Sequence, residues 1–178
     1  MTTATPGTPA AERSGAVTFK GNPMTLIGPE VEVGKPAPDF KLIANDMSEK
    51  KLSDYRGKTV ILSVVPSLDT PVCDLQTRAF NEKAAGLKDT VVLTVSLDLP
   101  FAQKRWCGAA GATNVVTLSD YKHHTFGPSY GLMIKELGLL ARAVIVIDKN
   151  GVVRYKQYVK EVATEPKYDE VIEAAKKA

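Results

Sequence analysis

The chain has little of several features that would define a protein class by themselves. Two cysteines among 178 residues are too few for the disulfide scaffold of a small secreted domain. No apolar run approaches the roughly 18 residues needed to cross a bilayer, so we expect no membrane span. Aromatic residues make up 7% and the net charge is +3, which leaves no basic, aromatic-rich stripe for nucleic acid. Neither a membrane nor a nucleic acid is therefore an expected partner.

Residues 1–15 are rich in threonine, alanine, proline and glycine and lack the apolar core of a secretory signal. This composition is typical of a disordered tail. We expect residues 16–178 to form one domain, because their number matches the usual size of a single core. A cytoplasmic location is expected, where thiols stay reduced unless their oxidation is catalytic or regulatory.

Alternating strand and helix patterns follow the tail. Near-continuous apolar runs at residues 59–65 and 91–97 predict strands buried on both faces. Weaker strand patterns occur at residues 39–42, 115–118, 143–147 and 152–158, and helical patterns at residues 52–57, 73–85, 101–107, 123–130 and 168–177. Residues 17–27 predict an N-terminal β-hairpin. The sum is an α/β fold with a central mixed β-sheet flanked by helices, and its order resembles a thioredoxin-like fold.

The segment after the first buried strand carries the most chemical information. Pro66 ends the strand, and Cys73 arrives in the first turn of the next helix. Unpaired N–H groups and the positive end of the helix dipole stabilise a thiolate there, and the thiolate is the nucleophilic form. Thr70 is close enough in sequence to aim its hydroxyl at the sulfur or at a bound oxygen. The competing interpretation is that Cys73 is a small buried hydrophobe.

The pattern Pro66-x-x-x-Thr70-x-x-Cys73 resembles the active-site signature of the peroxiredoxins. With Ser67 and Asp69 included, it is similar to the thiol peroxidase branch, the atypical two-cysteine peroxiredoxins. The similarity covers nearly everything after residue 15 and includes residues 99–107, 140–144 and 164–166.

The resemblance implies a role for each site residue. Cys73 would be the peroxidatic cysteine, and Cys107 would resolve its sulfenic acid as an intramolecular disulfide. Thr70 and Arg142 would hold the thiolate and polarise the peroxide, while Pro66 shields the site from water. The resemblance also implies hydrogen peroxide and organic (alkyl or lipid) hydroperoxides as substrates, thioredoxin as reductant and a homodimer. It implies no metal and no organic cofactor.

Elementary physics agrees with two of these roles. Arg142 stands in the apolar run of residues 139–147, where a buried guanidinium is costly without an anionic partner such as a thiolate. The alternative is an edge arginine with its head in solvent. Cys107 is too distant for a Cys-x-x-Cys dithiol, and a disulfide needs Cα atoms within about 7 Å. We therefore expect local unwinding, either of the first turn of the Cys73 helix or of residues 101–107.

The two cysteines are also compatible with functions other than a peroxidase. A thiol–disulfide oxidoreductase needs a close-spaced dithiol, but Thr70 and Gln76 occupy those positions. A redox sensor using the same two cysteines stays open, because it shares the first chemical steps. A permanent structural disulfide is disfavoured by a reducing compartment. A zinc site with His123 and His124 is disfavoured because adjacent histidines point to different sides of a helix.

Two features have no settled role in the sequence. Trp106 stands where the thiol peroxidase pattern usually has phenylalanine, and we expect it to pack in the core or to cover the disulfide. Residues 132–139 contain Met133, Ile134 and Leu137, which would offer an apolar surface either to organic hydroperoxides or to a second subunit.

Overall fold

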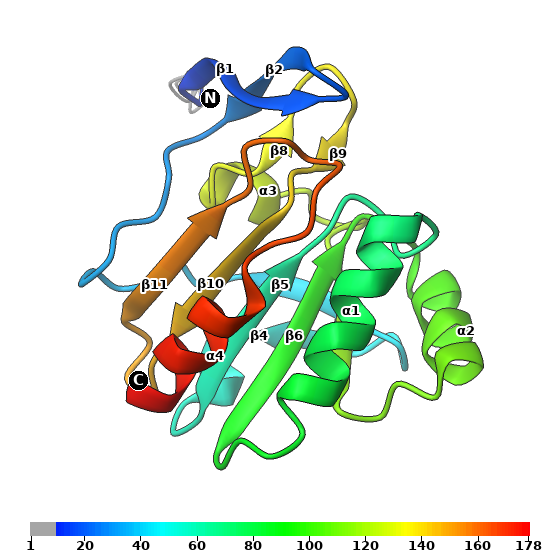
Figure 1. The fold of residues 1–178 in the computed structure, drawn as a ribbon, viewed down its shortest axis with the longest axis vertical. Helices are drawn as coiled ribbons and strands as arrows, with labels where there is room; N and C mark the ends of the chain where they lie inside the picture. Colours follow the sequence, from blue (N-terminus) through cyan, green and yellow to red (C-terminus); the bar gives the residue numbers. More distant parts are fainter. Residues whose placement is uncertain (1–9) are drawn as a thin grey trace, which may run out of the picture.

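The computed structural model describes residues 10–178, and its centre is a seven-stranded mixed sheet (Figure 1). Its three central strands are parallel, and the outer pairs run antiparallel to their neighbours. The strand order is β11-β10-β5-β6-β7-β3-β4. The bounds are β3 (Lys41–Ala44), β4 (Glu49–Lys51), β5 (Thr59–Val64), β6 (Thr90–Ser96), β7 (Val115–Ser119), β10 (Ala143–Ile147) and β11 (Val153–Tyr158). The predicted mixed sheet is confirmed.

Helices cover the sheet. Figure 1 shows α1 and α4 side by side on one face, with α2 beside α1 at the outer edge of the molecule. The helices are η1 (Leu52–Tyr55, a 3-10 turn), α1 (Pro71–Lys83), α2 (Pro100–Ala110), α3 (Phe126–Ser129) and α4 (Tyr168–Lys177). Within the part of the chain that the structure describes, no helix is long and apolar enough to cross a membrane.

The central strands are buried because both faces of the sheet are covered. In β5, Ile61 belongs to the apolar cluster beneath α1 and α4, together with Phe80 and Val171. Its neighbours Val60 and Leu62 belong to the cluster on the opposite face. Side chains alternate between the two faces of a strand, so a strand covered on both sides is apolar throughout. This is the physical origin of the near-continuous apolar runs in the sequence.

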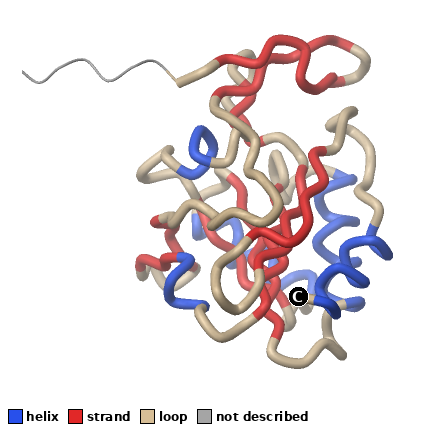
Figure 2. The backbone as a smooth tube through the Cα atoms, turned by 90° about the vertical axis from the view of Figure 1, so that its left-hand side faces the viewer, coloured by secondary structure: helices blue, strands red, loops and turns tan. Residues whose placement is uncertain are grey.

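A second, smaller sheet lies at one end of the molecule, as Figure 2 shows. Its order is β1-β2-β8-β9, with bounds β1 (Glu12–Phe19), β2 (Asn22–Ile27), β8 (Met133–Ile134) and β9 (Leu139–Leu140). Strands β1 and β2 form the predicted N-terminal hairpin, which turns at Lys20 and Gly21 with φ values of 50° and 81°. Positive φ at both positions is the geometry of a two-residue hairpin turn.

The predicted boundary of the tail is corrected by this hairpin. Strand β1 begins at Glu12, so residues 12–15 belong to the domain rather than to a tail. The Arg13 side chain donates hydrogen bonds to the carbonyl oxygens of Gly28 (2.9 Å) and Gly131 (2.7 Å). Pairing with β2 therefore orders a segment whose composition looked unstructured. Residues 1–9 of the predicted tail lie outside the described residues.

Residues 132–139 form most of a short hairpin rather than an apolar surface. Ile134 is completely buried, and Leu132 and Leu140 are buried beside it in the core. Leu137 is the partly exposed member, at 37%. The expectation that Ile134 would be offered to a ligand or a second subunit is wrong, because β8 pairs with β2 and turns that side chain inward.

Helix boundaries also differ from the prediction: η1 ends at Tyr55, α1 runs from Pro71 to Lys83 rather than over residues 73–85, and the largest differences are in α2 and α3. Helix α2 continues past Gly108 and ends at Gly111, which has the left-handed φ of 62° typical of a helix C-terminus. Helix α3 begins at Phe126 rather than at residue 123, because the Asp120 carboxylate accepts the backbone N–H groups of Phe126 and Gly127 at 3.2 Å each. Side-chain capping by a residue before the helix therefore decides where it starts.

Candidate active site

The candidate site forms where β5 ends and β10 begins. These strands are antiparallel neighbours, with Ala143 opposite Val64. The loop that leaves β5 and the residue that precedes β10 therefore lie at the same edge of the sheet. This topology brings Arg142 to Cys73, although 69 positions separate them in the sequence.

Cys73 is the third residue of α1. Thr70 is the N-cap, and Pro71 occupies the first helical position, where a missing N–H costs nothing. The first backbone hydrogen bond of the helix runs from the Asp74 N–H to the Thr70 carbonyl oxygen, at 3.0 Å. The N–H groups of Val72 and Cys73 consequently precede any intrahelical acceptor and are available to an anion. The Cys73 side chain is 0% exposed and packs against Val65 and Leu68.

Arg142 is buried, at 2% exposure, and donates three side-chain hydrogen bonds. Its Nε donates to the Val162 carbonyl oxygen (2.8 Å), its Nη1 to Gln76 Oε1 (2.9 Å) and its Nη2 to Cys73 Sγ (3.2 Å). Within residues 10–178, no aspartate or glutamate forms an ion pair with it. Among these three partners, the Cys73 sulfur is the one that can carry negative charge and so balance the buried guanidinium.

Gln76 is a site residue that sequence reasoning missed. It lies one helical turn after Cys73, is completely buried, and accepts the Arg142 Nη1–H while donating its own Nε2–H to Ser63 Oγ at 2.7 Å. Glutamine therefore links the guanidinium to β5 and fixes its plane. The i, i+3 spacing from Cys73 was the available signal, because it places both side chains on one face of the helix.

Gln76→Ala is expected to lower the free energy of unfolding by about 1–3 kcal/mol, because it leaves the Arg142 Nη1–H and the Ser63 hydroxyl without their buried partner. We also expect slower peroxide reduction, since the guanidinium is less firmly held. Urea unfolding and the rate constant of Cys73 oxidation measure the two effects. Gln157→Ala, on β11, is the matched control: Gln157 is only half-buried and lies outside the Cys73 network. Equal effects of the two substitutions would contradict the assignment.

Thr70 and Pro66 lie on the loop that leads into α1. The Thr70 hydroxyl donates to the Ser67 carbonyl oxygen at 3.0 Å rather than to the Cys73 sulfur. Its proton is therefore engaged, while its lone pairs can accept a hydrogen bond from a ligand. Pro66 is buried directly after Val65, which packs against Cys73.

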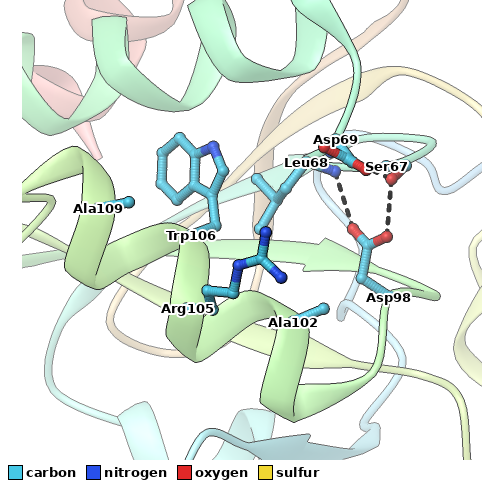
Figure 3. Close-up of a pocket in the computed structure, with 8 residues that line it drawn as sticks. All are labelled: Ser67, Leu68, Asp69, Asp98, Ala102, Arg105, Trp106 and Ala109. Carbon is cyan, nitrogen blue, oxygen red and sulfur yellow. Dashed lines mark hydrogen bonds between the residues drawn. The ribbon is translucent and has the colours of Figure 1, made fainter.

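Asp98 holds this loop in shape. Its carboxylate accepts the Ser67 hydroxyl (2.7 Å) and the Leu68 N–H (2.8 Å), as Figure 3 shows. A pocket of about 340 Å³ lies between the loop and α2. Leu68 and Trp106 line the pocket and also belong to the packing around Cys73, so the pocket adjoins the apolar cluster that contains Cys73.

Cys107 is the predicted site residue that the structure does not bring to the others. It lies on α2, half-buried, with its sulfur 3.5 Å from Thr117 Oγ1 on β7. Thr117 in turn donates to Asn45 Oδ1 at 2.8 Å. Both cysteines are free. A disulfide between Cys73 and Cys107 therefore requires the Cys107 sulfur to leave β7.

The charge of Arg142 also acts on the phenol of Tyr168. Burial raises the pKa of its phenol, a hydrogen bond to Glu165 raises it further, and the Arg142 charge opposes both. Because the pKa is raised, Tyr168 is a neutral phenol at neutral pH. It therefore places no negative charge beside Arg142.

The histidines considered for zinc lie elsewhere. His123 Nε2 meets Glu49 Oε2 at 3.1 Å on the surface. Among residues 10–178, no group of three or more histidine, cysteine, aspartate and glutamate side chains is placed to hold a metal ion.

Known proteins share this sequence and this fold. A profile of the Redoxin family matches residues 32–172. The thiol peroxidase of Bacillus subtilis is 57% identical over 160 residues, which cover 90% of this chain and 96% of that protein. The thiol peroxidase of Halalkalibacterium halodurans is 58% identical over 163 residues, covering 92% and 98%. The chain belongs to the thiol peroxidase branch of the redoxin family. It is thus a peroxidase, an oxidoreductase.

Solved structures confirm the thioredoxin-like fold of this thiol peroxidase. A peroxiredoxin-like protein from Aquifex aeolicus superposes with a TM-score of 0.86 at 43% identity, over 96% of this chain and 99% of that one. The thiol peroxidase from Chromobacterium violaceum gives a TM-score of 0.83 at 19% identity, over 90% and 95%. The second similarity shows the fold alone.

Proposed function

We propose that the protein is a thioredoxin-dependent peroxidase that reduces hydrogen peroxide and organic hydroperoxides, with Cys73 as the peroxidatic and Cys107 as the resolving cysteine. One observation carries the proposal. The buried Arg142 guanidinium has two neutral oxygen acceptors and the Cys73 sulfur as its partners, and the sulfur is the one that can carry negative charge. This arrangement supports a nucleophilic thiolate at the N-terminus of α1.

In the first step, the Cys73 thiolate attacks one oxygen of the hydroperoxide. A sulfur–oxygen bond forms, the oxygen–oxygen bond breaks, and the sulfur is oxidised to a sulfenic acid. The departing oxygen takes a proton and leaves as water or an alcohol. Arg142 stabilises the charge that develops on the oxygens, assisted by the free N–H groups of the first helical turn. Thr70 accepts a hydrogen bond from the peroxide, because its own proton is held by Ser67.

In the second step, the Cys107 thiol attacks the sulfenic sulfur. The disulfide bond forms, the sulfur–oxygen bond breaks, and water leaves. We propose that α2 is the segment that unwinds. Its buried side chains are those of Pro100 and Gln103, whereas α1 is anchored by several buried side chains (Cys73, Gln76, Thr77 and Phe80). A segment with little buried surface opens at low cost.

In the third step, a dithiol returns the disulfide to two thiols by exchange. We propose that this dithiol is thioredoxin. Helix α2 lies at the edge of the molecule (Figure 1), so a disulfide that includes Cys107 on the unwound α2 is accessible to a protein reductant. The cycle needs a reducing compartment, so the cytoplasm remains the proposed location. We also propose that the protein forms a homodimer, because the resemblance to the thiol peroxidases implies one.

Cys107→Ser tests the cycle. The variant is expected to consume about one equivalent of hydrogen peroxide, to stop at the Cys73 sulfenic acid and to overoxidise when peroxide is in excess, because nothing resolves it. Peroxide consumption with thioredoxin, thioredoxin reductase and NADPH measures turnover, and mass spectrometry of non-reduced peptides identifies a Cys73–Cys107 disulfide in the wild type.

Two outcomes would contradict the proposal. Unchanged turnover in Cys107→Ser would remove the resolving role. If glutathione and glutathione reductase supported turnover of the wild type and thioredoxin did not, glutathione would be the reductant instead of thioredoxin. Cumene hydroperoxide run beside hydrogen peroxide tests whether organic hydroperoxides are substrates.

A further inference from the structure

Trp106 links the two helices that carry the cysteines. Its indole Nε1–H on α2 donates to Asp74 Oδ1 on α1 at 2.8 Å. The other carboxylate oxygen, Oδ2, accepts the Arg78 Nε–H at 2.8 Å, and the Arg78 guanidinium lies 5.6 Å from the centroid of the Trp106 ring. The three side chains form a closed triangle, which we call the Trp106 clasp. A hydrogen bond to a charged acceptor is stronger than a neutral one.

The Trp106 clasp joins the sequence neighbours of the two cysteines. Asp74 follows Cys73 directly, and Trp106 directly precedes Cys107. The indole packs against the cluster of Val65, Leu68 and Cys73, and Figure 3 shows it on α2 beside Leu68. In the closed form, Trp106 therefore occupies the side of α2 that faces Cys73.

Successive residues of a helix point about 100° apart, so Trp106 and Cys107 cannot both face α1. The Cys107 sulfur meets Thr117 on β7 instead. Cys107 reaches Cys73 only if α2 unwinds and the Trp106 side chain withdraws from Asp74. The bond between Trp106 and Asp74 is thus broken before the disulfide forms, while attack on peroxide leaves it intact.

We propose that Trp106 is a positioning residue that times the reaction: its hydrogen bond to Asp74 keeps α2 closed during peroxide attack and slows resolution by Cys107. This inference rests on the proposed function, because it requires the Cys73–Cys107 disulfide. It goes beyond that function in assigning the rate of the second step to a side chain that touches neither peroxide nor reductant. A phenylalanine at this position packs similarly but has no N–H to donate.

The clasp predicts how the protein tolerates peroxide. The Cys73 sulfenic acid either meets Cys107 or reacts with a second peroxide and is overoxidised. Slower resolution favours overoxidation, so the closed clasp makes Cys73 more sensitive to high peroxide. Loosening the clasp is expected to raise the peroxide concentration that overoxidises half of Cys73.

Rapid-mixing kinetics on the full-length reduced protein tests the proposal. Trp106 is the single tryptophan, so its fluorescence reports on its own environment. The phase that depends on peroxide concentration gives sulfenic acid formation, and the phase that does not gives the resolution rate. Acid quenching followed by mass spectrometry measures disulfide formation in variants that lack the indole.

We expect Trp106→Phe and Asp74→Ala each to speed resolution about tenfold, the equivalent of about 1.4 kcal/mol. Asp74→Asn keeps an acceptor for the indole and should lie between wild type and Asp74→Ala. The double variant Trp106→Phe/Asp74→Ala should be no faster than either single variant, because both remove one bond. Additive effects, near a hundredfold, would show that the residues act separately and would overturn the clasp.

Lys104→Ala is the matched control, since Lys104 is an exposed residue of the same helix whose side chain makes no hydrogen bond in the part of the chain that the structure describes. It should leave both phases unchanged. If wild type forms the Cys73–Cys107 disulfide but Trp106→Phe and Asp74→Ala resolve at the wild-type rate or slower, the clasp is wrong and the proposed function stands. If wild type forms no such disulfide, both fail.

Discussion

Cys73→Ser is expected to lose peroxide turnover by about 10³-fold or more, with the fold intact. A serine hydroxyl is only weakly nucleophilic at its ordinary pKa, and residues 10–178 place no general base within hydrogen-bond distance of this position. The described neighbours of the sulfur cannot act as a nucleophile in its place, because they are the guanidinium of Arg142 and the apolar side chains of Val65 and Leu68. Loss of the nucleophile therefore removes the chemical step itself.

The measurement is peroxide consumption by the coupled thioredoxin assay beside a thermal melt of each variant. Cys107→Ser is the matched control, because it also exchanges one sulfur for oxygen but should retain the first equivalent of peroxide reduction. Full turnover by Cys73→Ser would refute the mechanism. If Cys73→Ser showed no cooperative melting transition, the loss of turnover would be due to misfolding. Cys73→Ala would then be assayed at a temperature where it is folded.

Much of the fold could be predicted from the sequence because its signals are local and repeated. Strand β5 is apolar on both faces since both are covered, and helix α4 has its predicted bounds. Strands β8 and β9 could not be predicted, because two residues carry no periodic pattern and their pairing is decided by the approach of β2. Residues 12–15 likewise form a strand only because they pair with β2, and their own sequence does not show that pairing.

The site shows the same division between local and long-range information. The position of Cys73 at a helix start follows from Pro66, which comes shortly after β5, and from the helical pattern after it. A buried charge in an apolar run marks Arg142. The Asp98 carboxylate that braces the loop and the bond between Trp106 and Asp74 carry no sequence signal, because each joins segments about 30 positions apart. Only the tertiary fold brings these groups together.

Arg142→Ala is expected to slow the reaction of Cys73 with hydrogen peroxide by about 10²–10³-fold, equivalent to about 3–4 kcal/mol. The guanidinium favours the thiolate and stabilises the charge that develops on the departing oxygen. Two reagents separate these contributions. Alkylation by iodoacetamide needs only the thiolate, whereas peroxide reduction also needs the breaking oxygen–oxygen bond to be stabilised. The variant should therefore lose more of its rate with peroxide than with iodoacetamide.

Arg154→Ala is the matched control for this substitution. Arg154 lies on β11 with half of its side chain exposed, and its guanidinium pairs with Asp148 rather than with the site. The Asp148 carboxylate also accepts the backbone N–H groups of Asn150 and Val152, so it keeps partners when Arg154 is removed, and both rates should stay near those of wild type. Arg142→Lys should fall between wild type and alanine, because an ammonium keeps the charge but cannot reach the Val162 carbonyl, Gln76 and the sulfur together. If Arg142→Ala reacted equally more slowly with peroxide and with iodoacetamide, Arg142 would act only by stabilising the thiolate. Near-normal rates with both reagents would show that Arg142 has no role in the reaction.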